Sequence, residues 1–152
     1  MIYPVLEFDY LRHGHLATNV WHAQMAGHPK ILTYNGPDMG RANRRASMRI
    51  EHDDGRTEAI PRILSRDEYP FACTVEGGRS AWVGHIPPEQ NSAQGGLIAA
   101  FLRSKHVFPD NGPRSRFVAA VTNYPDGPVT NPCKPACKPL CSEGDCRLVS
   151  GT

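Results

Sequence analysis

Glycine and proline interrupt this sequence so often that only short helices and strands fit between them. The 152 residues include 14 of each, and they become most frequent from Asn111 onward. Glycine adopts positive φ and proline fixes φ and lacks a backbone donor, so both favour turns. After Tyr124 the chain becomes Pro-, Gly- and Cys-rich and loses apolar periodicity. We therefore expect one domain over residues 1–124 and a C-terminal tail over residues 125–152.

Short segments of two different periodicities alternate along the first 124 residues. Apolar alternation and β-branched residues predict strands at residues 3–8, 31–34, 60–66, 81–87 and 117–122. Helical spacing behind the candidate N-caps Thr18, Asp38 and Asn91 predicts helices near residues 18–26, 38–48 and 91–105. This mixture predicts an α+β fold with a small mixed sheet and helices.

The positive charge of the chain is small in sum but concentrated in one segment. The net charge is +2, and seven arginines lie between residues 41 and 66: Arg41, Arg44, Arg45, Arg49, Arg56, Arg62 and Arg66. Guanidinium groups match phosphate in a bidentate way, which favours a phosphate-binding surface. Acidic residues are interleaved, so a solvated charged surface is the alternative. No apolar run approaches the roughly 20 residues of a membrane helix, and we expect no membrane partner.

Six polar residues whose side chains can act in catalysis or bind a metal lie within one short stretch: Asp67, Glu68, His85, Glu89, Asn91 and Gln94. On the expected elements, the acidic pair ends one strand, a second strand follows, and Glu89 and Asn91 open a helix. Phosphodiester hydrolysis needs a base that deprotonates water and a hard cation that neutralises developing charge. Carboxylate and amide oxygens suit one Mg²⁺ or Mn²⁺ ion, so the pattern is consistent with a single-metal site.

The same residues also have a plain structural interpretation. An acidic pair before Tyr69 and Pro70 is typical of a strand that ends in a solvated turn. His85 would then be a packed or half-exposed strand residue, and Asn91 a helix N-cap. The corresponding alternative function is a non-catalytic nucleic-acid-binding module that uses the Arg-rich helix. A hydrolase based on His85 ranks last, because the sequence offers no nucleophile in a recognisable setting.

Three motifs in a fixed order resemble the NucA/NucB deoxyribonuclease family. They are Asp67-Glu68-Tyr69-Pro70-Phe71-Ala72, Glu76-Gly77-Gly78 and Pro88-Glu89-Gln90-Asn91-Ser92-Ala93-Gln94-Gly95-Gly96. Residues 41–46 are similar to an Arg-rich helix of toxin-type members. The order and spacing agree over residues 67–96 and, more loosely, over residues 41–121.

This resemblance implies a sequence-nonspecific DNA endonuclease with a ββα-metal core, similar to His-Me finger nucleases but with an acidic residue in place of the histidine base. Asp67 then becomes the candidate general base. Glu68 becomes a second active-site carboxylate that tunes Asp67 or touches the metal through water. Glu89 and Asn91 become metal-side residues, and Gln94 a phosphate or supporting contact. The resemblance assigns the DNA backbone to Arg44 and Arg45, and we expect the guanidinium groups of Arg41 and Arg66 to contact phosphate as well.

The chain departs from the secreted members of that family at two points. Arg66 stands where many members have a cysteine, so a disulfide at that point is absent. The N-terminus also lacks the pattern of a Sec signal peptide. Toxin domains carried by large secreted effectors lack such a signal as well. We therefore expect an antibacterial effector or secreted nuclease, delivered into a target cell, with a cognate immunity protein as partner.

Four of the five cysteines crowd into the tail, namely Cys133, Cys137, Cys141 and Cys146. Their spacing differs from the Cys-x-x-Cys pattern of strong zinc motifs. Two disulfides, a structural Cys₄ Zn²⁺ site and unpaired thiols are therefore the three interpretations. We expect Cys73 to pack beside Phe71 rather than to act as a nucleophile, because no histidine near it in sequence would activate it.

Overall fold

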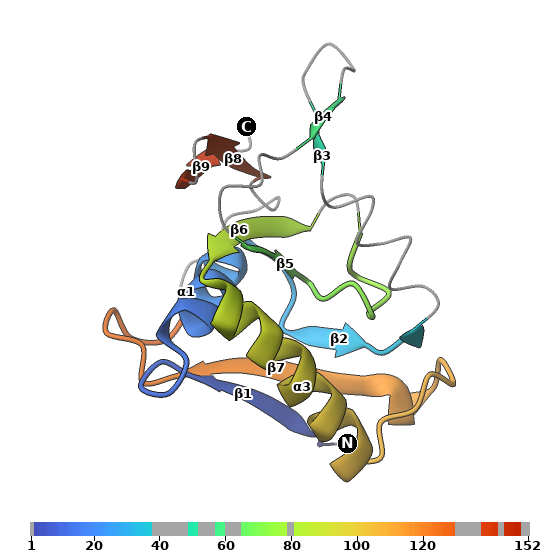
Figure 1. The fold of residues 1–152 in the computed structure, drawn as a ribbon. Coiled ribbons are helices and arrows are strands. Elements are labelled where there is room, and N and C mark those ends of the chain that lie inside the picture. The colour runs from blue at the N-terminus through green and yellow to red at the C-terminus, as the bar shows by residue number, and fades with distance from the viewer. Residues whose placement is uncertain are drawn as a thin grey trace.

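The computed structural model describes residues 2–37, 49–51, 57–59, 65–78, 81–129, 138–142 and 145–149. For residues 49–51, 57–59, 65–66, 138–142 and 145–149 it describes the backbone alone. The described residues form two long helices and small sheets (Figure 1), which confirms the expected α+β class.

A three-stranded mixed sheet forms one layer of the fold (Figure 1). Its order is β1 (Val5–Asp9), β7 (Arg116–Thr122) and β2 (Ile31–Thr33). The central strand β7 runs parallel to β1 and antiparallel to β2. Phe8 of β1 and Phe117 of β7 are buried in the hydrophobic core on one face of this sheet. All three strands lie where alternation predicted them.

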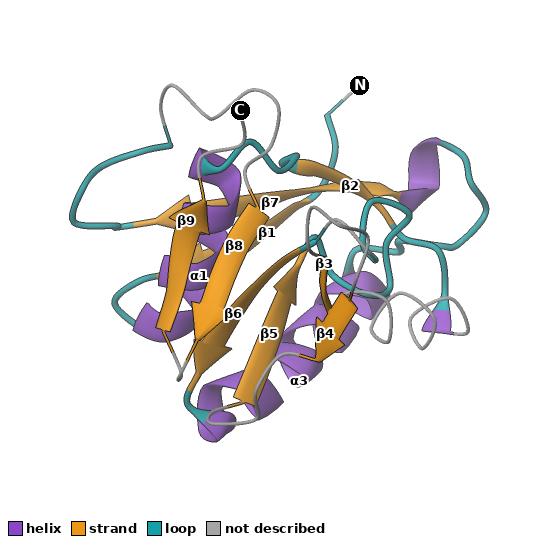
Figure 2. Ribbon diagram, turned by 90° about the horizontal axis from the view of Figure 1, so that it is seen from above, coloured by secondary structure: helices purple, strands orange, loops and turns teal. Residues whose placement is uncertain are grey.

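Helix α1 (Gly14–Met25) lies between this sheet and a strand pair formed by β5 (Ser65–Tyr69) and β6 (Trp82–Ile86) (Figure 1). Figure 2 shows β5 and β6 side by side from above. A helix in this position needs apolar residues on much of its circumference. Its fully buried apolar residues are Leu16, Ala17, Val20 and Ala23.

The predicted N-cap at Thr18 is wrong. Helix α1 begins at Gly14, and Thr18 lies inside it, where its hydroxyl donates to the carbonyl oxygen of Gly14 at 2.6 Å. The backbone amides of His15 and Leu16 instead donate to Oε1 of Gln90, at 3.0 and 3.2 Å. The helix therefore needs no local cap, because a residue distant in sequence accepts its first hydrogen bonds.

Strands β5 and β6 form an antiparallel pair, and helix α3 (Pro88–Ser104) follows directly. The prediction that α3 begins near Asn91 is wrong, because the helix begins three residues earlier. Pro88 at the first helical position is favourable, since its fixed φ suits a helix and its missing N–H would lack a partner there anyway. Asn91 consequently lies inside the first turn instead of capping the helix.

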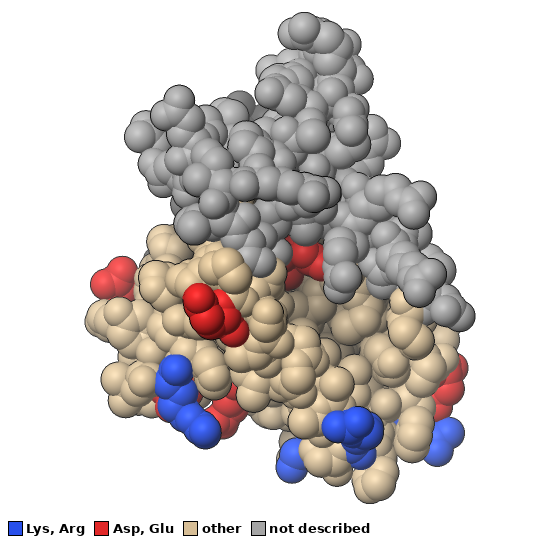
Figure 3. All heavy atoms as spheres, viewed as in Figure 1, with Lys and Arg blue, Asp and Glu red and all other residues tan. Residues whose placement is uncertain are grey.

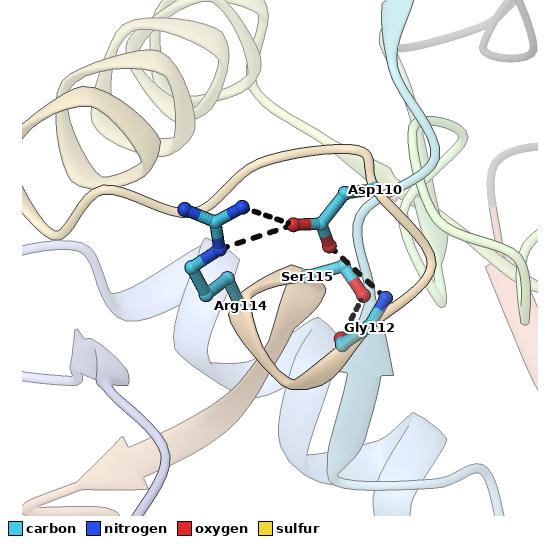
Figure 4. Close-up of polar contacts among 4 residues, drawn as sticks. All are labelled: Asp110, Gly112, Arg114 and Ser115. Atoms are coloured by element: carbon cyan, nitrogen blue, oxygen red, sulfur yellow. Dashed lines mark hydrogen bonds and ion pairs between the residues drawn. The ribbon is translucent and has the colours of Figure 1, made fainter.

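The chain returns from α3 to β7 through a loop that ends in the 3₁₀-helix η1 (Pro113–Ser115). Figure 4 shows how this loop is closed. The Asp110 carboxylate accepts hydrogen bonds from the Gly112 amide at 3.0 Å and from Nε of Arg114 at 3.1 Å, and the Ser115 hydroxyl donates to the Gly112 oxygen at 2.6 Å. These local bonds fix the path by which α3 leads back into the central strand.

Two further strand pairs complete the described backbone. Strand β3 (Arg49–Glu51) pairs with β4 (Thr57–Ala59), and β8 (Lys138–Ser142) pairs with β9 (Asp145–Val149) beside β6. The tail therefore contains a hairpin that its irregular composition did not predict. No helix within the described ranges is long and apolar enough to cross a membrane.

Candidate active site

The acidic pair lies within β5 rather than at its end, which corrects the sequence-based expectation. The strand continues to Tyr69, whose side chain is anchored in the core. Successive strand residues point to opposite faces. Asp67 faces α1 and is 1% exposed, whereas Glu68 lies on the other face and is 9% exposed. Asp67 is therefore the carboxylate that lies between the strand pair and the helices.

A buried amide from α1 holds the Asp67 carboxylate. Nδ2 of Asn19 donates to Oδ2 of Asp67 at 2.7 Å and to the backbone oxygen of Asp67 at 3.1 Å. Oδ1 of Asn19 accepts a hydrogen bond from Nε1 of Trp82 at 2.8 Å. One side chain thus joins α1, β5 and β6 around a single carboxylate.

Gly84 makes this approach of α1 to the strands possible. It is the cross-strand neighbour of Asp67 in β6. A Cβ atom at Gly84 would overlap Oδ1 of Asn19 and lie 2.7 Å from its Cγ, closer than real Cβ contacts come. Any larger residue at this position would displace the Asn19 amide, so the glycine belongs to the site.

The pKa of Asp67 is raised to about 7. Burial is the largest cause, because it disfavours the charged form, and the negative charge of Glu68 raises the pKa further. The hydrogen bond from Asn19 and the interaction with the Gln94 amide lower it. The charge of Glu68 thus acts in the expected direction on the pKa of Asp67, but burial contributes more. A carboxyl with this pKa is suited to accept and release protons near neutral pH.

Helix α3 presents its polar residues at different depths. Glu89 in the first turn is exposed, and Asn91 is half-buried. Gln90 turns toward α1 and accepts its first amides. Gln94, one turn further along, is 7% exposed and faces the Asp67 carboxyl. The structure therefore brings Asp67 and Gln94 together and leaves Glu89 at the solvent-facing end of the same helix.

Gln94 has an amide nitrogen with spare hydrogen-bonding capacity. Its interaction with Asp67 lowers the pKa of that carboxyl, yet Nε2 makes no hydrogen bond of normal length and angle in the described part of the chain. A buried donor without a full bond is costly. The position beside Asp67 means that a bound water or phosphate oxygen could complete the bonding of this donor.

Other residues of the motifs have structural roles. Tyr69 is fully buried, and its hydroxyl donates to the Pro29 oxygen at 2.6 Å and accepts from Nε2 of Gln24 at 3.0 Å. Burial raises the pKa of this hydroxyl. The Glu76 carboxylate accepts hydrogen bonds from the backbone and hydroxyl of Thr33, at 2.9 and 2.8 Å. These bonds tie β5 and the following loop to the rest of the core.

Each of the two glycines after Glu76 is required for a different steric reason. A Cβ atom at Gly77 would overlap the backbone oxygen of Phe71. Gly78 has φ of 110°, a left-handed conformation that side chains rarely adopt. The two glycines of the Glu-Gly-Gly motif are therefore explained by the path of the loop between β5 and β6, which folds back on the backbone of Phe71.

The structure describes some of the remaining residues named from the sequence and leaves others outside its described ranges. His85 is half-buried in β6, on the sheet face opposite to Asp67, and Cys73 packs against the hydrophobic core, both as expected. Arg66 lies in β5 with only its backbone described. Cys141 and Cys146 are directly opposite each other in the β8–β9 pair. The other named positions lie outside the described residues: Arg41, Arg44, Arg45, Cys133 and Cys137.

The donor chemistry around α3 fits a hard divalent cation. Among the described residues, no three His, Cys, Asp or Glu side chains gather as a metal cluster. Mg²⁺ differs from Zn²⁺ in using one or two carboxylates and retaining several waters, so it does not need such a cluster. The face shown in Figure 3 is hollowed, with acidic side chains at the margin of the hollow and described basic side chains along the lower edge.

Comparison with protein families decides the class of this protein. The sequence profile of the family described as Deoxyribonuclease NucA/NucB matches residues 20–112, more than half of the chain. The chain belongs to the NucA/NucB family. Among curated proteins, none matches its sequence. The resemblance drawn from the motifs is confirmed, and NucA/NucB membership supports a nuclease that acts on DNA over a non-catalytic binding module.

The region matched to NucA/NucB contains β5, β6 and all of α3. Asn19 lies just before the first matched residue, so the comparison says nothing about it. Sequence reasoning also missed Asn19, and one signal could have found it: a polar residue among the buried positions Leu16, Val20 and Ala23 of one helix. Such a residue needs a buried partner. Gly84 and Trp82 gave no comparable signal.

Proposed function

We propose that this protein is a sequence-nonspecific endonuclease that hydrolyses DNA phosphodiester bonds with one divalent cation, using Asp67 as the general base. In this proposal β5, β6 and α3 form a ββα-metal core in which an aspartate takes the place of the usual histidine. The family match supports DNA as the substrate. The identity of the base and the use of a metal rest on the geometry argued below.

One observation carries the assignment of the base. The Asp67 carboxyl is buried, held by Asn19, and has a pKa of about 7. A general base works best when its pKa lies near the working pH. Glu68 has a weaker claim, because strand alternation directs it to the other face, where it acts on Asp67 through its charge.

Glu89 and Asn91 in the first turn of α3 would hold the cation through a carboxylate and an amide oxygen. When bound, Mg²⁺ or Mn²⁺ would neutralise charge that develops on the phosphate and the leaving oxygen. The exposed position of Glu89 is compatible with an ion that retains waters and meets the DNA backbone. The N-terminal end of α3 also favours an anionic phosphate nearby.

The chemical step balances with the residues of this chain. Asp67 takes a proton from a water molecule as the water oxygen bonds to phosphorus. The bond from phosphorus to the 3′-oxygen breaks, and this oxygen takes a proton from solvent. Gln94 would donate its spare amide hydrogen to the water or to a phosphate oxygen, which would orient the reacting group.

Nicking of supercoiled plasmid with purified protein tests this proposal. Cleavage should require Mg²⁺ or Mn²⁺ and stop when EDTA is added. Glu89→Gln should lower the rate at least about a hundredfold, with part of the loss recovered at high metal concentration. The matched control is Glu7→Gln, which changes an exposed carboxylate on β1. Full cleavage in EDTA would exclude a metal-dependent reaction.

We propose separately that the protein acts as an antibacterial effector. An antibacterial effector that is secreted or delivered into a target cell would need a cognate immunity protein in the producing cell. Arg66 stands before Asp67 where many family members have a cysteine, and this difference supports the toxin-type effector over the secreted nucleases of the family. Toxicity of the expressed chain to bacteria that disappears with Asp67→Asn would support the effector role, and wild-type growth during expression of active nuclease would count against it.

A further inference from the structure

Asn19 is a polar residue in an apolar setting. It is 6% exposed, and Leu16, Val20 and Ala23 on the same helix are fully buried. Burying a side-chain amide is unfavourable unless its hydrogen bonds are satisfied. Asn19 meets this condition with three bonds, to Asp67 twice and to Trp82 once. The amide is therefore a fixed part of the interior rather than a solvated surface group.

The indole of Trp82 determines which way the Asn19 amide is turned. An indole nitrogen only donates, so the atom that meets Trp82 must be the oxygen of the amide. Nδ2 consequently points to Asp67, and its two hydrogens are available for Oδ2 and for the backbone oxygen. The amide orientation follows from chemistry, because the opposite orientation would place two donors against each other.

This orientation makes the two carboxylate oxygens of Asp67 unequal. Nδ2 has no lone pair that accepts a hydrogen bond, so a proton on Oδ2 would face a donor. Oδ2 must therefore remain an acceptor in both protonation states of Asp67. A proton that arrives at the carboxyl has its place on Oδ1.

We propose that Asn19, locked by Trp82, is a positioning residue that reserves Oδ2 of Asp67 as an acceptor and so presents Oδ1 as the atom that takes the proton from water. This inference rests on the proposed function of Asp67 as the general base. It adds a residue outside the matched family region and assigns the proton to one atom. Asn19 does not touch the substrate and acts through Asp67.

The surroundings of Asp67 are suited to such a device. Strand β6 places Gly84 against the Asn19 amide, which leaves no room for another rotamer on that side. Strand β5 contributes the charge of Glu68, and α3 contributes the Gln94 amide. On α1, the ring of His22 stacks on Trp82 with centroids 6.5 Å apart. His22 is thus a titratable group on α1 that the test must separate from Asp67.

Steady-state kinetics of plasmid nicking test the proposal with Asn19→Leu, which keeps the size and removes the donor. We expect kcat to fall about 10- to 100-fold while KM changes less than about threefold. The rising limb of kcat against pH should move to higher pH, since the Asn19 donor lowers the pKa of Asp67. A residue with a purely structural role would not move this limb. Asn123→Gly is the matched control, because it removes an Asn–Asp bond at the surface.

The possible results separate the two proposals. Wild-type protein without cleavage, or full cleavage by Asp67→Asn, overturns the proposed function. Loss of cleavage in Asp67→Asn together with wild-type kcat and pH limb in Asn19→Leu overturns the role of Asn19 alone. If circular dichroism shows Asn19→Leu to be unfolded, Trp82→Phe decides, and a wild-type kcat and limb there overturn the proposal. A limb that moves only in His22→Gln assigns the titration to His22 and also overturns it.

Discussion

Two Asp–Asn pairs in this molecule share the same chemistry and behave in opposite ways. In the interior, Asn19 donates to Asp67 at 2.7 Å, and at the surface Asn123 donates to Asp9 at 2.9 Å. The pKa of Asp67 is raised to about 7, whereas the pKa of Asp9 is lowered. The hydrogen bond from asparagine lowers the pKa in both cases. The hydrogen bond therefore cannot be what distinguishes the two aspartates.

Burial is the difference between the pairs. For Asp67 the loss of hydration is the largest effect on the pKa, and it outweighs the bond from Asn19 and the interaction with Gln94. For Asp9, which lies half-exposed at the surface, the bonds from Asn123 and from the Leu11 amide are the two largest effects on the pKa. At the surface, the asparagine bond thus lowers the aspartate pKa below its ordinary value. In the interior, it only reduces the rise in pKa that burial causes. A general base needs the second arrangement.

The largest effect should come from replacing the interior aspartate. Asp67→Asn should lower the plasmid-nicking rate at least about a hundredfold, equivalent to about 2.7 kcal/mol in the activation barrier, because the base is lost. Asp9→Asn, the matched surface change, should leave the rate within about twofold. Rates are compared at pH 8 in Mg²⁺. Equal losses in both variants would show that a general loss of carboxylate charge, and not the base, controls the rate.

The two aspartates should also change stability with pH in opposite directions. Native Asp67 keeps its proton between its ordinary pKa of 3.8 and about 7, whereas the unfolded chain releases it. The free energy of unfolding should therefore fall as the pH rises through this range, by at most about 4 kcal/mol. The Asp67→Asn variant should lack this fall and exceed the wild type in stability at pH 8.

Asp9 gives the reverse sign because its native pKa is lowered. Its contribution to stability is present above its ordinary pKa and is lost as the pH falls further. Urea unfolding followed by circular dichroism between pH 3 and 8 measures both effects. A constant difference between wild type and Asp67→Asn across pH 4 to 8 would contradict a protonated Asp67 in the folded state.

A smaller effect should follow from disturbing the interior pair without changing either member. Gly84→Ala would push against the Asn19 amide, and we expect a loss of about 1–3 kcal/mol in unfolding free energy together with slower nicking. Gly95→Ala on α3 is the control, because its Cβ would meet nothing within 4 Å. That change should stabilise the helix by about 0.5–1 kcal/mol. Thermal melts of both variants would show this, and a neutral Gly84→Ala would mean that Asn19 has room to move.

The sequence predicted the parts of the fold that depend on local patterns. Alternation located β1, β2, β6 and β7, and the motif order located the stretch that carries Asp67. Features that depend on distant contacts were missed. Gln90 accepts the first amides of α1, so Thr18 misled the prediction of the helix start. The sequence of the tail shows no apolar alternation, so it did not predict the hairpin β8–β9.

The candidate site divides in the same way. Residue type and order were enough to nominate Asp67 as the base, but its burial and pKa depend on α1, which is separated from β5 by about 40 residues of chain. Asn19 was not nominated because an asparagine in a helix has many ordinary uses. Only the approach of α1 across Gly84 shows that this asparagine contacts the Asp67 carboxylate.

The smallest effect should come from the surface pair. Asn123 adopts φ of 58°, a left-handed conformation that glycine reaches without strain and alanine does not. Asn123→Gly loses the bond to Asp9 but relieves the backbone, so unfolding free energy should change by less than about 0.5 kcal/mol. Asn123→Ala should cost about 1 kcal/mol. Urea unfolding at pH 7 measures both. If Asn123→Gly lowers the unfolding free energy as much as Asn123→Ala does, the hydrogen bond to Asp9 matters more at this position than the backbone conformation. The hydrogen bond of the surface pair would then contribute to stability although the pair is not buried.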